Sequence, residues 1–319
     1  MTQVHFDDRS DEPTLRRQLY DGAIHVFSPT PGTRELIGIA REMCEAAFAP
    51  HHPADAQHHL AVEDYNEILK TLKPSFIHDP RCKQAIRKIL EERGCDLERT
   101  FFDVPRLRTA TSDDYLTSGL AYAFKPHRDT WYSPPQCQLN WWLPVYDVTP
   151  DNCMAFHTAY WERSLRNSSA EFDYQDWNSG GRKAAHAQGK KDTRRQSEAL
   201  EPVELDPQLR LVPEPGGMIV FSAAHLHSTV PNTSGRTRVS IDFRTVHLDE
   251  LVTNGGAPNL DSACSGTTIG DYLRGTDFSH VPDALRDAYE RLETSATRPD
   301  LAPNTMSDLL NADEPAPSA

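Results

Sequence analysis

The stretch TRVSIDFRTVHL, residues 237–248, constrains the fold most strongly because polar and apolar side chains alternate along it. Successive side chains of an extended strand point to opposite faces of a sheet, so the two kinds separate. The polar face carries Arg238, Ser240, Asp242 and Arg244, and the apolar face carries Val239, Ile241 and Phe243. This pattern is typical of a barrel strand with a polar lumen, and a buried arginine in such a lumen needs an anion.

Four more short runs rich in β-branched and aromatic residues precede this strand from residue 100 onward, separated by Pro, Gly, Asn and Asp. They read TFFDVPRLRTAT, LNWWLPVYDV, LRLVPE and GGMIVFSA. Trp141 and Trp142 lie on opposite faces of the second run, and we expect both in the core. Together these runs predict a β core over residues 99–248.

The residues before this core have a helical pattern. Apolar side chains recur at helical spacing along TRELIGIAREMCEAAF, residues 33–48, and a second helix is expected over 80–93. We therefore expect residues 1–98 to be the helical amino-terminal part of a single domain that spans 1–319. The expected fold class is mainly β with flanking helices.

Two further segments fall outside the β pattern. Residues 161–205 are polar without sustained periodicity, which predicts an insertion that acts as a lid. Its aromatic and basic side chains would contribute to a substrate pocket: Trp161, Arg163, Arg166, Tyr174 and Trp177. Residues 249–319 form a carboxyl-terminal extension with one expected helix, 283–293, and a tail whose composition predicts disorder.

Charge and composition narrow the classes of partner. The net charge of -14 would repel nucleic acid and anionic lipid, so neither is an expected partner. No apolar run approaches the ~20 residues that span a bilayer, and the first residues lack a signal-peptide pattern, so a cytoplasmic location is expected. The six cysteines form no C-x-x-C pair, and we expect reduced, structural thiols.

A histidine and an aspartate stand two positions apart at His127 and Asp129. Residues at this spacing in an extended strand share a face, so both side chains can reach one metal ion. An isolated pair of this kind is common by chance, so a further ligand is required. The kinase catalytic loop also begins His-Arg-Asp, but Pro134 stands where its asparagine should be and no glycine-rich loop precedes it, which excludes that function.

The stretch GGMIVFSAAHLHSTVPNTSGRTRVSIDFR, residues 216–244, supplies the further ligand. Either His225 or His227 would complete a set of two histidines and one carboxylate with His127 and Asp129. Such a facial triad holds non-haem Fe(II) on three sites and leaves the opposite positions open.

These motifs together resemble a known family. The H-x-D pair, about a hundred residues, then His-Ser-x-x-Pro-Asn-x-Ser, with an arginine eleven positions after the histidine, is similar to phytanoyl-CoA hydroxylase-like Fe(II)/2-oxoglutarate dioxygenases. The resemblance covers residues 124–246. It implies a double-stranded β-helix (cupin-like jelly roll) core, with Fe(II), 2-oxoglutarate and O₂ as requirements. The implied reaction is hydroxylation of an unactivated C–H of a small molecule, in bacterial secondary metabolism, with release of succinate and CO₂.

The resemblance also assigns roles to residues. The metal ligands fall on His127, Asp129 and His227, with His225 as the rival for the last position. Arg238 takes the place of the arginine that pairs with the C5 carboxylate of 2-oxoglutarate, with Arg236 as a possible substitute. Further expected contacts of 2-oxoglutarate are Ser240, Thr229 and Asn140.

The chain departs from the family pattern at one point. Where many members have Asn-Gly followed by Pro-Gly-Ser-His, this sequence reads DNCMAFHTAYWERS. The carboxylate of Asp129 is retained, which argues for oxygenation over halogenation. Residues near the metal pair or this departure are expected to wall the substrate: Trp131, Tyr132 and Trp161. Lys125 and Arg128 are expected to be solvated or, alternatively, to contact an acidic substrate.

Two other functional classes stay open. One is a cupin-type metalloenzyme that uses the same triad without 2-oxoglutarate, and binding of a carboxylate by Arg238 would discriminate the two. The other is a binding or scaffold protein with a decayed site. The second is disfavoured because a decayed site is expected to lack at least one ligand, and none is missing here.

Overall fold

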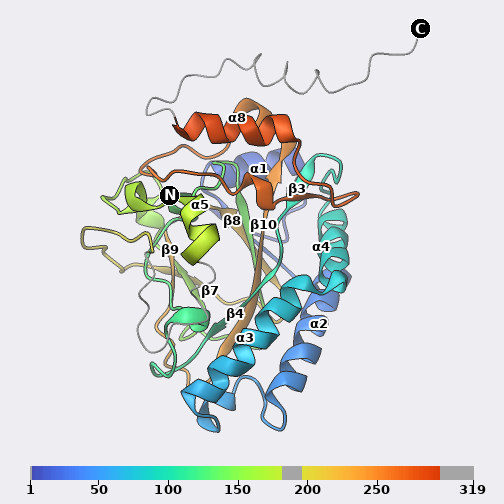
Figure 1. Cartoon of the computed structure of the whole chain (residues 1–319), viewed down its shortest axis with the longest axis vertical. Coiled ribbons are helices and arrows are strands. Elements are labelled where there is room, and N and C mark those ends of the chain that lie inside the picture. Colours follow the sequence, from blue (N-terminus) through green and yellow to red (C-terminus); the bar gives the residue numbers. More distant parts are fainter. Residues whose placement is uncertain (1, 182–195, 295–319) are drawn as a thin grey trace.

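Two β-sheets form the core of the computed structural model, which describes residues 2–181 and 196–294 (Figure 1). The larger sheet has the order β1-β2-β8-β5-β10-β3-β11, and β4 also pairs with β10. Its strands are β1 (Val4–Phe6), β2 (Ile24–Phe27), β3 (Thr100–Phe102), β4 (Arg106–Ala110), β5 (Leu139–Pro144), β8 (Met218–Ser222), β10 (Arg238–His247) and β11 (Leu273–Arg274). The smaller sheet, β7-β6-β9, consists of β6 (Met154–Phe156), β7 (Leu209–Leu211) and β9 (His227–Thr229).

The two sheets pack against each other through apolar side chains. Trp142 and Phe221 of the larger sheet share a buried cluster with Met154, Phe156 and Leu211 of the smaller one. From β5 onward the chain passes back and forth between the sheets, with β5, β8 and β10 in the larger one and β6, β7 and β9 in the smaller one. This winding is that of a double-stranded β-helix, and the expected jelly-roll fold is confirmed.

Strand β10 has the two-faced character that its sequence predicts. It lies between β4 and β5, with Ile241 in register with Leu107 on one side and Leu143 on the other. These side chains are buried in the main core, together with Trp141. Trp142 points to the other face and is buried too, so the expectation that both tryptophans are in the core is confirmed.

Helices cover the outer face of the larger sheet (Figure 1). The amino-terminal helices are α1 (Glu12–Tyr20), α2 (Pro31–Phe48), α3 (Val62–His78) and α4 (Pro80–Glu92), with the short helices η1 (Ala56–His58), η2 (Gly119–Ala121) and η3 (Asp129–Tyr132). The first predicted helix begins two residues early because Thr30 caps it and Pro31 suits its first position. Apolar side chains of α2, α3 and α4 pack in one core with those of β5 and β10.

The amino-terminal part is not wholly helical, and that expectation is corrected. Strands β1 and β2 pair in parallel, and β2 extends the larger sheet beside β8. The four-residue β2, IHVF, is too short to show a periodicity in sequence, and its assignment depends on the distant partner β8.

The later segments add short elements around this core. They are η4 (Thr158–Tyr160), η5 (Ser169–Glu171), α5 (Tyr174–Asp176), the π-helix η6 (Trp177–Gly181), α7 (Leu248–Thr253), η8 (Ile269–Asp271) and α8 (Asp283–Thr294). Helix α8 matches its prediction, whereas the expected disordered tail lies outside the described residues. All six cysteines are free thiols. In the described part of the chain, none of the helices has the length and apolarity to cross a bilayer.

We expect Ile241→Ala to lower the free energy of unfolding by about 3 kcal/mol, because it removes a fully buried side chain between two paired strands. Val212→Ala, at a side chain that is 46% exposed, is the control and should change it by less than about 0.5 kcal/mol. Urea unfolding followed by circular dichroism measures both. Equal effects of the two substitutions would contradict the packing described for β10.

Candidate active site

Backbone hydrogen bonds join the two histidines of the expected metal site. His127 N donates to His227 O at 3.0 Å, and His227 N donates to His127 O at 2.9 Å, in an isolated antiparallel bridge. His227 is the first residue of β9, and His127 lies two residues before Asp129, where η3 begins. The bridge therefore brings the H-x-D turn into contact with a strand about a hundred positions further along the chain.

Each imidazole is held in the tautomer that leaves Nε2 free. His127 Nδ1 donates to the Lys125 carbonyl at 2.8 Å, and His227 Nδ1 donates to the His225 carbonyl at 2.9 Å. Because a carbonyl oxygen only accepts hydrogen bonds, the proton of each ring is on Nδ1. The Nε2 lone pairs are thus available to a metal.

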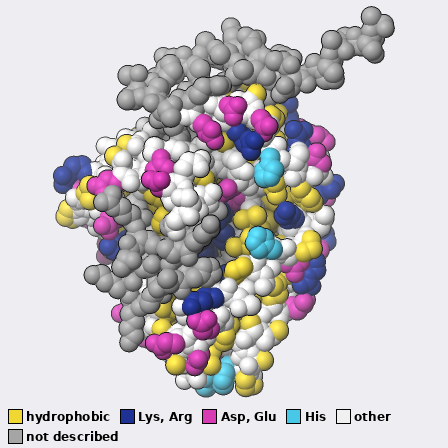
Figure 2. Space-filling model, viewed as in Figure 1, with side chains coloured by type: hydrophobic (Ala, Val, Ile, Leu, Met, Phe, Trp, Pro, Cys, Tyr) yellow, Lys and Arg dark blue, Asp and Glu magenta, His cyan; other side chains and the backbone are white. Residues whose placement is uncertain are grey.

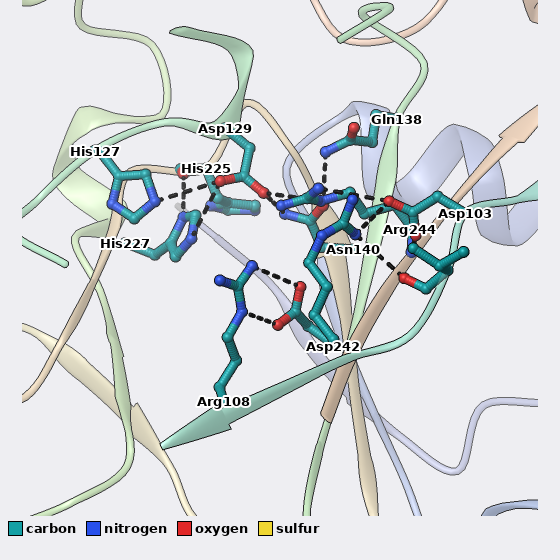
Figure 3. Close-up of polar contacts among 12 residues, drawn as sticks. Asp103, Arg108, His127, Asp129, Gln138, Asn140, His225, His227, Asp242 and Arg244 are labelled. Atoms are coloured by element: carbon teal, nitrogen blue, oxygen red, sulfur yellow. Dashed lines mark hydrogen bonds and ion pairs between the residues drawn. The ribbon is translucent and has the colours of Figure 1, made fainter. Parts of the chain in front are cut away.

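The Asp129 carboxylate completes the group. Its Oδ1 lies 3.3 Å from His127 Nε2 and 3.9 Å from His227 Nε2, and the three side chains point toward one another in Figure 3. Ligand atoms about 2.1 Å from an ion, on adjacent corners of an octahedron, lie about 3 Å apart, so this arrangement suits one ion. Within residues 2–181 and 196–294, no other group of three histidine, cysteine or acidic side chains could hold a metal.

Burial and charge set the ionisation states that a metal requires. Burial alone would raise the pKa of Asp129, but the adjoining His127 imidazole and the charge of Arg244 outweigh it and hold the pKa far below its usual range. Burial, followed by repulsion from His127, lowers the pKa of His227 to about 4. At neutral pH the carboxylate is therefore ionised and the His227 imidazole is neutral, as metal ligands must be.

The second oxygen of Asp129 is held by the protein. Asn140 Nδ2 donates to Oδ2 at 2.9 Å, and Arg244 Nε lies 3.7 Å from the same oxygen (Figure 3). Asn140 accepts a hydrogen bond from Gln138 Nε2 at 2.9 Å, and Gln138 accepts one from the Tyr272 hydroxyl at 2.7 Å. These partners fix the carboxylate so that Oδ1 is presented to the metal position.

Arg128, which stands between the two ligands in sequence, is buried, and the expectation of a solvated side chain is wrong. It is 1% exposed, and it donates to Asp261 at 3.2 Å and to three backbone carbonyls. Asp261 also accepts a hydrogen bond from Trp131 Nε1 at 2.7 Å. A charge without a local partner is compensated here by an aspartate 133 positions away, which anchors the ligand turn to the carboxyl-terminal extension.

A cavity of about 800 Å³ opens beside the triad, and both the expected metal ligands and the expected carboxylate-binding arginine line it. His127, Asp129, His227 and Arg238 all line it. On the face shown in Figure 2, hydrophobic side chains gather near the middle, with basic and histidine side chains among them. A cavity of this size can hold a co-substrate and a bulky small molecule together.

His225 and Arg236, the alternatives to His227 and Arg238, do not line this cavity. The His225 ring packs on Trp161 at 4.4 Å between ring centres, and it does not line the cavity. Arg236 is exposed, and it pairs with a surface aspartate at 3.0 Å. The geometry therefore assigns the metal position to His227 and the buried cation of the cavity to Arg238.

Arg238 is a buried cation with a free donor. Its Nη1 donates to the carbonyls of Asn152 and Cys153, at 3.1 Å each, and its guanidinium carbon lies 5.6 Å from the centre of the Trp142 ring. Its Nε is buried without a hydrogen-bond partner among the described residues. Burial lowers the pKa of Arg238 to about 10, so it is charged at neutral pH. A buried guanidinium with an unused N–H fits a carboxylate.

A family comparison agrees with this geometry. The family model described as phytanoyl-CoA dioxygenase (PhyH) matches residues 21–240, which is more than half of the chain. The chain belongs to the phytanoyl-CoA dioxygenase family. Enzymes of this family are non-haem oxygenases that use Fe(II) with 2-oxoglutarate and O₂. The donor set of the triad fits Fe(II), and the free Nε of Arg238 fits a carboxylate of 2-oxoglutarate.

Solved structures with a similar fold are distant. EvdO2 from Micromonospora carbonacea var. aurantiaca, complexed with 2-oxoglutarate, is 12% identical over 75% of this chain and 92% of that chain, with a TM-score of 0.42. The non-heme alpha ketoglutarate dependent epimerase SnoN from nogalamycin biosynthesis is 14% identical over 74% and 82%, with a TM-score of 0.37. The non-heme monooxygenase ThoJ is 14% identical over 89% and 94%, with a TM-score of 0.38. No curated protein matches the chain.

Of the three other residues expected to contact 2-oxoglutarate, two line the cavity and one does not. Thr229 and Asn140 line the cavity, although the Asn140 amide already donates to Asp129. Ser240 Oγ is buried without a hydrogen-bond partner among the described residues, but Ser240 does not line the cavity. Contacts of these three residues with the family's co-substrate stay predictions.

Only one of the three residues expected to wall the substrate lines the cavity. Tyr132 lines the cavity, whereas Trp131 and Trp161 do not. Trp131 is fully buried and bonded to Asp261. Trp161 lies so close to Gly22 that a Cβ there would come within 2.5 Å of its ring, so it packs on backbone rather than on the cavity.

The described parts of the insertion, residues 161–181 and 196–205, contribute to the cavity wall. Its lining residues there are Phe172, Tyr174, Trp177 and Gln196. Arg163 and Arg166 do not line the cavity, and Arg166 is largely exposed. Residues 182–195 of the expected lid lie outside the described residues, and closure over substrate stays a prediction.

Sequence reasoning missed several polar residues of the site. Arg108 forms a two-point pair with Asp242, at 2.5 and 3.3 Å, and Arg244 contacts both Asp129 and Asp103 (Figure 3). The alternation of polar and apolar residues in the sequence places such side chains on the polar face of a strand. It does not show which of them pair with one another. No local signal marks Asp261, because its partners are distant in sequence.

We expect His227→Ala to lose stoichiometric Fe(II) binding, because it removes one of three ligand atoms. His225→Ala is the matched control: it removes a buried imidazole of the same strand-entry turn that faces Trp161, and iron should be retained. Iron content after anaerobic loading and desalting measures both variants. Retention of iron by His227→Ala with its loss in His225→Ala would reverse the assignment.

Proposed function

We propose that this chain is an Fe(II)/2-oxoglutarate-dependent dioxygenase that hydroxylates an unactivated C–H bond of a bulky small molecule. The single observation that supports it most is that one cavity is lined by both the triad and Arg238, whose buried Nε has no hydrogen-bond partner among the described residues. The balanced reaction consumes R–H, 2-oxoglutarate and O₂ and yields R–OH, succinate and CO₂. One oxygen atom enters the new hydroxyl group and the other enters succinate.

The chain's own residues have distinct roles in this proposal. His127, Asp129 and His227 would hold Fe(II), which supplies the activation of O₂ when bound. Arg238 would bind the C5 carboxylate of 2-oxoglutarate and so set its distance from the metal position. Asn140 and Arg244 hold the outer oxygen of Asp129 and keep the carboxylate oriented.

The size of the cavity supports a bulky substrate. About 800 Å³ exceeds what a five-carbon dianion can fill, and the remaining walls are rich in aromatic side chains. We infer that the substrate is an elaborate small molecule of the kind found in secondary metabolism. Hydroxylation is the proposed outcome because it needs no catalytic acid or base beyond the metal site.

The alternative function is that of a cupin-type metalloenzyme that uses the triad without 2-oxoglutarate. The same cavity would then need another partner for the buried charge of Arg238. Anaerobic titration of the Fe(II)-loaded protein with 2-oxoglutarate, followed by the visible charge-transfer absorption of a bound Fe(II)–2-oxo-acid pair, separates the two functions.

We expect Arg238→Ala to weaken 2-oxoglutarate binding at least 30-fold, the lower range for truncating a buried charge pair, about 2 kcal/mol. Arg236→Ala removes an exposed arginine two positions away and should leave the affinity unchanged. The same absorption titration measures both. Wild-type affinity in Arg238→Ala would contradict the role of Arg238 in binding 2-oxoglutarate.

A further inference from the structure

The cavity carries a charge opposite to that of the chain. Apart from Asp129 and Arg238, the described residues that line it include five lysines and arginines and three aspartates. The whole chain has the reverse balance, with 33 basic and 47 acidic side chains. Low-dielectric walls strengthen the field of such a cluster, so the cavity attracts anions although the protein is acidic.

The cationic excess centres on Asp242. Arg108 pairs with this carboxylate directly, and the charges of Arg108, Arg244 and Arg106 together lower its pKa despite its burial. Arg106 and Arg244 also share Asp103. With Asp129 set aside as a metal ligand, two carboxylates thus face three arginines, and they cannot neutralise a further cation.

Lys73 of α3 is that further cation. Its Nζ donates to the carbonyl of Leu120, and among the described residues no carboxylate lies within 4.0 Å of it. Burial, followed by repulsion from Arg108, lowers the pKa of Lys73 to about 7, while Asp242 acts in the opposite direction. An anion bound beside this amine would stabilise its charged form.

An aromatic wall connects this cluster to the metal position. The Phe124 ring stacks on His127 at 5.0 Å between ring centres, and the Arg108 guanidinium lies 5.6 Å from the centre of the same ring. Tyr122 packs edge-on against Phe124 at 4.9 Å. A flat or extended apolar body along this wall would have one end near the triad and the other near the cations.

We propose that the substrate is an amphiphilic anion, with a carboxylate, sulfate or phosphate held by Lys73 and Arg108 and an apolar body aligned along Phe124 beside His127. This inference rests on the proposed function, because it places the oxidised C–H on the body rather than at the anionic end. Arg238 is not involved, since its free donor is assigned to the co-substrate.

The test uses two probes that differ by one charge. 8-Anilinonaphthalene-1-sulfonate and uncharged N-phenyl-1-naphthylamine are titrated by fluorescence into the protein loaded anaerobically with Fe(II) and 2-oxoglutarate. We expect the sulfonate to bind about tenfold more tightly, the size of one partly buried charge interaction. Lys73→Gln should abolish most of that preference without changing the affinity of the uncharged probe.

Two controls keep the result specific. Lys73→Arg retains the charge and should retain the preference, and Lys88→Gln, at an exposed lysine of α4 paired with Glu35, should behave as wild type. The charge-transfer absorption in the same samples reports 2-oxoglutarate binding independently. Failure of that absorption in wild type would overturn the proposed function, whereas the probe preference and its response to Lys73→Gln test the anion site separately.

Three outcomes overturn the inference itself. One is equal affinity of wild type for the two probes, or no binding of the sulfonate. Another is an unchanged preference in Lys73→Gln. The third is weaker 2-oxoglutarate binding in Lys73→Gln with an unchanged probe preference, which would assign the cationic cluster to the co-substrate.

Discussion

The paired backbone hydrogen bonds between His127 and His227 are the constraint on which the site depends. They fix two ligand positions that are distant in sequence within one β-bridge, before any metal is considered. Each ring is then oriented by a carbonyl two residues upstream, so the same extended backbone that forms the bridge also selects the tautomer. Preorganisation of this kind lowers the entropic cost of binding an ion.

The polar face of β10 positions the charged side chains of the site. Arg238, Asp242 and Arg244 lie on that face, and each meets a different group. Arg238 lines the cavity with its Nε unpaired among the described residues, Asp242 pairs with Arg108, and Arg244 approaches the outer oxygen of Asp129. Because one strand carries all three, their spacing along the cavity wall is set by strand geometry. A shift of one residue in register would exchange the polar and apolar faces.

Local patterns in the sequence predicted what depends on local geometry and missed what depends on distant partners. The alternation along β10 survives in the structure because a strand fixes which side chains share a face. His127 and Asp129 also converge, although the expected extended strand is absent there and Asp129 begins the helix η3. The family resemblance supplied the choice between His225 and His227, and the structure supports it by turning His225 toward Trp161. Arg128 was expected in solvent because its partner Asp261 is 133 positions away. Strand β2 escaped prediction for the same reason, since its hydrogen bonds go to β8.

Function and stability are divided between the two faces of the larger sheet. The lumen face holds groups that cost free energy to bury without partners, such as the Arg238 Nε and the Ser240 hydroxyl. The outer face buries Val239, Ile241 and Phe243 against the amino-terminal helices, and this apolar burial offsets the cost. Because neighbouring residues of β10 serve the two faces alternately, the strand can carry unsatisfied polar groups at the site and still be the most extensively paired strand of the fold. The flanking amino-terminal helices therefore stabilise the fold by apolar burial. This burial compensates for the polar groups that lack hydrogen-bond partners on the lumen face.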